Sequence, residues 1–307
     1  MEQTSLLQDA LRYGRGFTRY GKPADYIPEL ARKDPSKLGI ACCDLRGNLA
    51  EAGDSRVKFT MQSISKLIAL IFALEQNGFD HVFSKVGLEP TGDAFNSTVR
   101  LDHLTNNKPF NPMINAGAIA VTSTIHGATL EARKEACLAF ARKLTDDPTL
   151  DVDYDVFLSE SRTGFKNRAI LYLMCSNGII EGNCEEHLEL YFTLCSLSCT
   201  CRDLSVFAAT MANNGVSPIT GETLIPLRTV RLVRSLMVTC GMYDYSGEFA
   251  ATVGMPSKSG VGGGILSCPI GKCGLAVYGP ALDEKGNSVG GLKMLEYLSQ
   301  HMELSMF

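Results

Sequence analysis

The run from Leu67 to Leu74 constrains the fold more than any other stretch, because every residue in it is apolar. A helix with apolar side chains on all faces is buried on all faces. The run is much too short to cross a bilayer, which needs roughly 20 apolar residues. Asn77 and Gly78 form a typical helix end. The sequence therefore predicts a buried helix over 62–76 at the centre of a globular core.

Ser63 and Lys66 stand where the chain enters this helix, three residues apart and so on one helix face. A serine hydroxyl is a weak nucleophile that needs a base within hydrogen-bond reach. Lysine acts as that base only if its pKa falls toward neutrality, and burial and the positive end of a helix dipole both lower it. The pattern predicts a serine nucleophile with a lysine base.

The alternative is that this spacing has no chemical meaning, since most S-x-x-K strings lie on solvated helix faces. A second copy, Ser55 to Lys58, shows how easily the pattern arises. We interpret that copy as a charged, strand-like segment, in which side chains three apart point to opposite faces. Only the copy that precedes the apolar helix has the context that the chemistry needs.

Composition narrows the class of protein. A chain of 307 residues with 45% hydrophobic and 20% charged residues is typical of a globular protein with a large core. A net charge of −4 gives no reason to expect nucleic acid or an anionic membrane as a partner. The start of the sequence has no secretory character, and the eleven cysteines show neither a disulfide framework nor a C-x-x-C pair. We expect reduced thiols, a cytoplasmic location, and no metal or cofactor.

Periodicity and turn residues predict an α+β fold formed by a single domain, 1–307. Helices are expected at 62–76, 115–127, 131–143, 163–176, 184–195 and 201–213, at the N-terminus with Thr4 as cap, after Pro226 and from Val289. Strands are expected at 39–44, 48–52, 250–257, 264–268 and 273–278. We interpret 151–155 as a solvated loop. Residues 1–60 and 220–307 would form a sheet with flanking helices, and 61–219 a helical subdomain.

A late glycine-rich segment supplies a second motif. Lys258-Ser259-Gly260 follows the early S-x-x-K, as the K-S/T-G strand does in penicillin-recognising enzymes. The glycines from Gly260 to Gly264 would let a backbone N–H approach a reacting carbonyl closely. The alternative is a strand that glycine only makes flexible.

Taken together, the motifs resemble those of the serine-dependent glutaminase family in its short bacterial form, over about residues 21–298. The matching blocks are Asp25 to Pro28, Gln62 to Lys66, Asn111 to Ala118, Glu160 to Asn167, Tyr191 to Ser196, Cys240 to Gly247 and Lys258 to Gly264. The resemblance implies a β-lactamase-like fold, with an antiparallel sheet, flanking helices and a helical domain. It also implies an amidohydrolase that converts L-glutamine to L-glutamate and ammonia without a cofactor, commonly as a dimer or tetramer.

The resemblance also implies a role for individual residues. Ser63 would be the nucleophile and Lys66 its base, Tyr243 a proton relay, and the Val261 N–H part of the oxyanion hole. The substrate-binding positions would be Tyr26, Ser63, Asn115, Glu160, Asn167, Tyr191, Tyr243 and Val261.

Residue chemistry agrees with that assignment. Glu160, the acid of the set, suits an α-ammonium, and neutral amides and phenols suit a carboxylate. Without the resemblance, buried Asn and Tyr often satisfy only local backbone. Two other functions share these motifs. One is a β-lactamase or D-peptidase, and the other is a catalytically silent amino-acid-binding or scaffold protein.

Overall fold

A five-stranded antiparallel sheet organises the molecule, in the strand order β2-β1-β8-β7-β6. The computed structural model describes residues 2–91 and 108–307. The strands are β1 (Gly39–Asp44), β2 (Leu49–Gly53), β6 (Ser257–Ser259), β7 (Gly264–Ser267) and β8 (Cys273–Tyr278). Both ends of the chain therefore contribute to one sheet, as predicted, and the fold is α+β.

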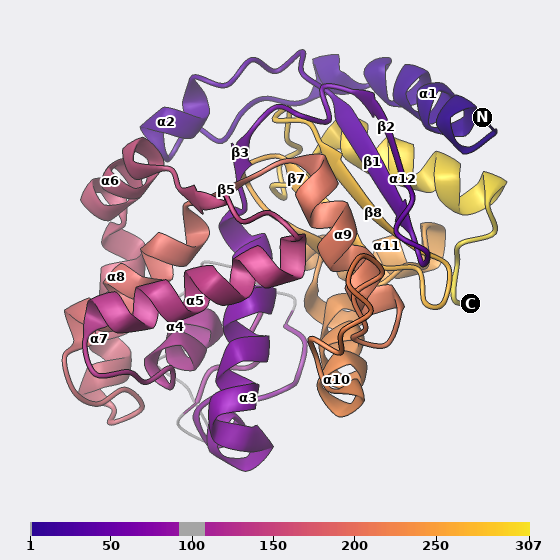
Figure 1. Cartoon of the computed structure of the whole chain (residues 1–307). Helices are drawn as coiled ribbons and strands as arrows, with labels where there is room; N and C mark the ends of the chain where they lie inside the picture. Colours follow the sequence, from indigo (N-terminus) through magenta and orange to yellow (C-terminus); the bar gives the residue numbers. More distant parts are fainter. Residues whose placement is uncertain (1, 92–107) are drawn as a thin grey trace.

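Helices cover both faces of this sheet (Figure 1). The terminal helices α1 (Glu2–Arg15) and α12 (Val289–His301) pack on one face, and α9 (Cys201–Ala212) packs on the other. Side chains alternate between the two faces with the strand period of two. In β8, Leu275 and Val277 join the core beneath the terminal helices, whereas Ala276 joins the core on the α9 side.

The middle of the chain is helical. The predicted helices are confirmed with small changes of boundary as α4 (Asn115–Ser123), α5 (Leu130–Thr145), α7 (Phe165–Ser176), α8 (Cys184–Cys195) and α10 (Leu227–Cys240). Several of them surround α3 (Ser65–Lys85), whose run from Leu67 to Leu74 is buried apart from the partly buried Phe72. In the described ranges, no helix is both long enough and apolar enough to cross a membrane. The division into two subdomains stays a prediction.

The central helix departs from prediction at both ends. A 3₁₀ turn, Gln62–Ile64, carries the serine, and the α-helix begins only at Ser65. At Gly78 the backbone has φ 75° and ψ 171°, so the helix breaks where the sequence indicated. A second helical segment then continues to Lys85.

Residues 151–155 are not a solvated loop, so that prediction was wrong. They contain β4 (Asp151–Val152) and the start of α6 (Tyr154–Thr163). Asp153 caps this helix, because its side chain accepts a hydrogen bond from Val156 N at 3.1 Å. A small second sheet, β3-β5-β4, joins β4 to β5 (Leu197–Cys199) and β3 (Phe59–Thr60). The sequence analysis did not predict it, because its strands have only two or three residues.

Three further predictions were wrong. Residues 250–257 are mostly helix α11 (Ser246–Thr252), because Ala250 and Ala251 favour helix. The segment from Ser55 to Lys58 contains a turn rather than a strand, and Ser55 Oγ donates to Glu51 at 2.8 Å. The first helix starts at Glu2, so Thr4 is not its cap.

The cysteines also differ from expectation. Nine are free and buried, but Cys175 and Cys184 form a disulfide between the end of α7 and the start of α8. Their Cα atoms are 7.0 Å apart. Nine residues separate them in the sequence, a spacing that did not stand out among eleven cysteines.

Close packing of α9 on β8 generates a stability prediction. A Cβ at Gly274 would lie 2.1 Å from Ala209 N and 2.2 Å from Ser205 O, so the α9 backbone would have to move. We expect Gly274→Ala to lower the free energy of unfolding by about 2 kcal/mol or more. Urea denaturation measures the change.

The control is Gly247→Ala, since a Cβ at Gly247 in α11 meets nothing within 4 Å. That variant should unfold at the wild-type urea concentration or slightly above it, because alanine favours helix more than glycine does. Equal stability of the two variants would contradict the close packing of α9.

Candidate active site

A cavity of about 420 Å³ brings together most of the predicted site residues. Its volume is in the usual range for small-molecule sites. Segments far apart in the sequence line it, and the predicted residues among its walls are Tyr26, Ser63, Asn115, Glu160, Asn167, Tyr191 and Val261. Lys66 and Tyr243 lie outside the lining but contact it, Lys66 through Asn115 and Tyr243 through Ser63.

Backbone geometry fixes the position of Ser63. Met61 N donates to Leu197 O at 2.8 Å, which ties the turn that carries Ser63 to the small sheet. Gln62, immediately before the serine, has φ 48°, and Tyr243 has φ 57°. Left-handed backbone at non-glycine residues is unfavourable and tends to occur at functional sites. Both strained residues contact the same centre, because the Tyr243 hydroxyl hydrogen-bonds with Ser63.

The glycine-rich segment lies directly against this turn. A Cβ at Gly260 would be 2.4 Å from Met61 O, and a Cβ at Gly262 would be 2.3 Å from Thr60 O. No side chain fits at either position. Glycine at both positions therefore allows the Val261 backbone to approach Ser63, and the Val261 backbone also hydrogen-bonds with Tyr243.

Lys66 is buried, with 2% of its surface exposed. Its Nζ donates to Met113 O at 3.0 Å and to Asn115 Oδ1 at 2.7 Å. Burial lowers the pKa of Lys66 to about 8, although Cys195 and Glu160 nearby act in the opposite direction. Two acceptors hold two hydrogens of the nitrogen. The third position is a hydrogen in the ammonium and a lone pair in the neutral amine.

Asn115 and Asn167 form a pair. The amide nitrogen of Asn115 donates to Asn167 Oδ1 at 2.9 Å, which turns Asn115 Oδ1 toward Lys66. The sequence analysis assigned both asparagines to the substrate. The structure adds a contact that it did not predict, since Asn115 also orients the amine.

Glu160 is a buried carboxylate in the cavity wall, with 6% of its surface exposed. It accepts a hydrogen bond from Gln62 Nε2 at 3.4 Å and forms no ion pair with any residue in 2–91 or 108–307. Burial raises its pKa to about 7, while Gln62 and Lys66 act to lower it. A cationic group that entered the cavity would find this carboxylate available.

Two tyrosines complete the inner wall. Tyr191 lies beside the Cys195 thiol, and burial raises its pKa well above the ordinary value. Burial also raises the pKa of Tyr243, partly offset by its hydrogen bond with Ser63. The fully buried Lys258 Nζ lies 4.6 Å from the centre of the Tyr243 ring and donates to Ser259 O at 2.6 Å. The predicted K-S-G segment thus stands next to Tyr243, on β6.

Sequence reasoning missed Gln62 and Cys195, which also line the cavity. Both stand inside matching blocks, immediately before Ser63 and four residues after Tyr191, but neither received a role. The left-handed φ of Gln62, which turns its side chain toward Glu160, could not be predicted from the sequence.

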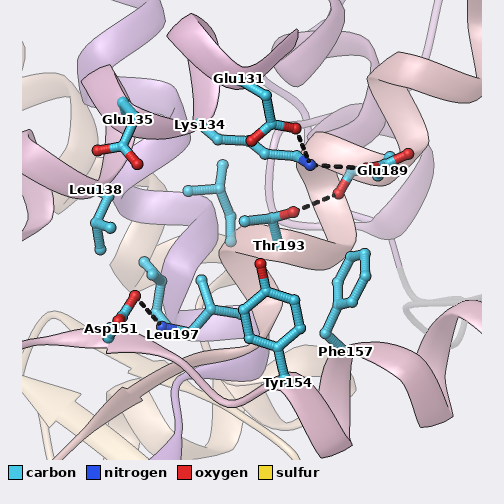
Figure 2. Close-up of a pocket in the computed structure, with 12 residues that line it drawn as sticks. Glu131, Lys134, Glu135, Leu138, Asp151, Tyr154, Phe157, Glu189, Thr193 and Leu197 are labelled. Atoms are coloured by element: carbon cyan, nitrogen blue, oxygen red, sulfur yellow. Dashed lines mark hydrogen bonds and ion pairs between the residues drawn. The ribbon is translucent and has the colours of Figure 1, made fainter.

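A second cavity of about 210 Å³ lies on the opposite face of α8 (Figure 2). Lys134 Nζ donates to Glu131 at 2.8 Å and to Glu189 at 2.7 Å, and Thr193 donates to the Glu189 backbone. Among the described residues that line it there is no serine or cysteine. The catalytic chemistry therefore belongs to the first cavity.

The fold and the first cavity define a class, an α+β enzyme of β-lactamase-like architecture with a buried serine and lysine at its central helix. Comparison with known proteins gives the family. The chain matches the glutaminase family over residues 21–307. It is 50% identical over 303 residues to a glutaminase of Clostridium tetani, with 99% of each chain covered.

Two solved structures agree with this match. A probable glutaminase of Bacillus subtilis has 38% identity and a TM-score of 0.93, over 100% of this chain and 98% of that one. A Bacillus subtilis glutaminase in covalent complex with 5-oxo-L-norleucine has 36% identity and a TM-score of 0.89, over 99% and 100%. The chain belongs to the glutaminase family.

The surroundings of Lys66 generate a prediction that does not depend on activity. Asn115→Asp places a carboxylate beside Nζ, and an opposite charge at this range raises a lysine pKa by about 1–3 units. NMR titration of protein labelled with ¹³C at lysine Cε should show Lys66 titrating near pH 8 in the wild type and at least about one unit higher in the variant. Lys66→Arg identifies the resonance by removing it. A Lys66 that titrates like exposed lysines would contradict the geometry.

Proposed function

We propose that this protein hydrolyses L-glutamine to L-glutamate and ammonia through a γ-glutamyl ester on Ser63. The observation that carries the proposal is the joint burial of Ser63, a lysine of lowered pKa and a carboxylate outside any described ion pair around one cavity. The covalent complex of the Bacillus subtilis relative with 5-oxo-L-norleucine supports it, because that complex formed by reaction with 6-diazo-5-oxo-L-norleucine.

Acylation begins with a proton transfer. The neutral Lys66 amine takes the proton of Ser63, and the Ser63 oxygen attacks the side-chain amide carbon. The negative charge that develops on the amide oxygen is stabilised by the backbone N–H groups of Ser63 and Val261. The proton then passes from Lys66 through Tyr243 to the departing nitrogen, which leaves as ammonia and restores the neutral amine.

Deacylation reverses the proton path. A water molecule enters as ammonia leaves, and Tyr243 and Lys66 accept its proton as its oxygen attacks the ester. The carbon–oxygen bond to Ser63 breaks, and the Ser63 oxygen recovers a proton from Lys66. The hydrogen bond between Tyr243 and Ser63 supports this shared role.

Substrate recognition assigns one partner to each end of the amino acid. We assign the α-ammonium to Glu160, because this buried carboxylate has no partner of opposite charge in an ion pair among the described residues. We assign the α-carboxylate to Tyr26, Asn167 and Tyr191, which line the cavity without adding positive charge beside Lys66. A peptide-bound glutamine lacks a free ammonium or carboxylate and should bind poorly.

Location and assembly remain proposals. The nine buried free thiols support a cytoplasmic setting, where thiols stay reduced. Exposed Phe165 and Tyr172 on α7 support a homo-oligomer, either a dimer or a tetramer, because large exposed apolar side chains often mark interfaces.

Replacement of the nucleophile tests the covalent route. Ser63→Ala should retain less than about one thousandth of the wild-type kcat while still binding glutamine, because it removes one oxygen and no charge. A coupled glutamate dehydrogenase assay measures turnover, and calorimetry measures binding. Ser55→Ala, in the second copy of the motif, is the matched control and should stay near wild-type activity. A Ser63→Ala enzyme with substantial turnover would exclude the ester.

Replacement of Glu160 tests substrate recognition. Glu160→Gln keeps the shape of the side chain and removes its charge. Loss of a charged hydrogen-bond partner costs about 1.5–3 kcal/mol, so the KM for glutamine should rise by roughly ten- to a hundredfold. N-acetylglutamine, which has no ammonium, should be a poor substrate for the wild type. Equal use of both substrates by the wild type would remove Glu160 from this role.

A further inference from the structure

The two cysteines of the disulfide differ from the other nine in accessibility. All nine free cysteines are buried. Burial raises the pKa of Cys137 to about 12 and raises that of Cys195 as well. Because the thiolate is the reactive form, such thiols are inert. Cys175 and Cys184 are only partly buried and already lie next to each other. In the described part of the chain, this pair is where an oxidant or a reductant in solvent reaches cysteine sulfur.

The connection between the two helices depends on this bond. Residues 176–183 join α7 to α8, and Gly178 and Gly182 in this loop have φ 67° and 82°. A Cβ at Gly178 would meet nothing within 4 Å, so the loop is not held by packing there. The other polar contact at this end is Glu185 with Arg168 and Tyr172, all at the surface, and exposed pairs of this kind contribute little.

The same two helices form walls of the active-site cavity. The first turn of α7 supplies Asn167, and the later turns of α8 supply Tyr191 and Cys195. Cys175 and Cys184 pack on the apolar cluster that contains Tyr191 and Phe192. The Phe192 ring lies against Gly164 at the start of α7, since a Cβ there would be 2.6 Å from its Cζ. A change in how α8 sits against α7 therefore reaches the substrate-binding wall.

We propose that Cys175 and Cys184 form a reversible thiol–disulfide site, and that the bond holds α7 against α8 and so increases the affinity of the cavity for glutamine. The kinetic part of this inference rests on the proposed function, whereas the redox chemistry does not. Cytosolic disulfides are commonly transient, which agrees with a site that opens and closes.

The redox step balances with a co-reactant of either of two classes. With hydrogen peroxide, two S–H bonds break and one S–S bond forms, and the two electrons and two protons convert the peroxide to two molecules of water. With a low-molecular-weight disulfide, one thiolate attacks it, one thiol leaves, and the second cysteine displaces the other thiol from the mixed disulfide. A dithiol reductant reverses either reaction.

The expected effect falls on KM more than on kcat. The nucleophile Ser63 and the base Lys66 lie at the start of α3, away from the α7–α8 connection, whereas Asn167 and Tyr191 lie on the linked helices. Reduction should raise the KM for glutamine by about three- to tenfold and leave kcat within about twofold.

The experiment compares the full-length chain after oxidised glutathione with the same chain after a dithiol reductant. Digestion after glutamate cuts at Glu181 and separates the two cysteines, so mass spectrometry under non-reducing conditions reports the bond directly. Cys175→Ser with Cys184→Ser should show the KM of the reduced wild type in both buffers. Cys240→Ser, which removes a buried cysteine, is the control and should respond as the wild type does.

Three results would overturn the inference. These are a bond that is absent after oxidation, a KM that is equal in the two states, and a double variant that still responds to oxidant. If neither state hydrolysed glutamine, the proposed function would fail instead, and the coupling would be read from calorimetric glutamine affinity in the two states. Equal affinities would then reject the coupling on its own terms.

Discussion

Burial of the Lys66 amine is the constraint on which the rest of the site depends. A charged ammonium taken out of water without a carboxylate partner is unfavourable by several kcal/mol. The protein meets this constraint by lowering the pKa of Lys66 to about 8 and by directing two neutral oxygens, from Met113 and Asn115, at its hydrogens. A direct ion pair would have stabilised the charged form and removed the base. The apolar α3 that follows Lys66 supplies the dry environment.

The same environment acts on the acid of the site. Burial raises the pKa of Glu160 to about 7, so this carboxylate is also held in a state that an incoming charge would stabilise. An amino acid brings its own ammonium, which restores the charge balance of the cavity when it binds. The free cavity is thus poorly solvated at both Lys66 and Glu160, and the substrate compensates Glu160 without a cation beside Lys66.

Backbone shape accounts for the arrangement of the catalytic groups. Gln62 and Tyr243 adopt left-handed φ values, and Gly260 and Gly262 lie within contact distance of the turn that carries Ser63. These features bring an early helix and a late strand together around one hydroxyl. The strain persists because β3, β5 and β6 hold both segments in place.

The sequence by itself determined the α+β class, the buried helix behind Ser63 and Lys66, and the order of the motifs. It could do so because apolar periodicity and capping are local properties. The resemblance located the residues that the cavity brings together. The sequence did not predict α6, α11 or the small sheet, since short elements carry weak periodicity and tertiary packing overrides it. Only the tertiary structure decided that Asn115 orients Lys66, that Gln62 reaches Glu160, and that Cys175 meets Cys184, because these contacts join segments whose separation in space no local pattern encodes.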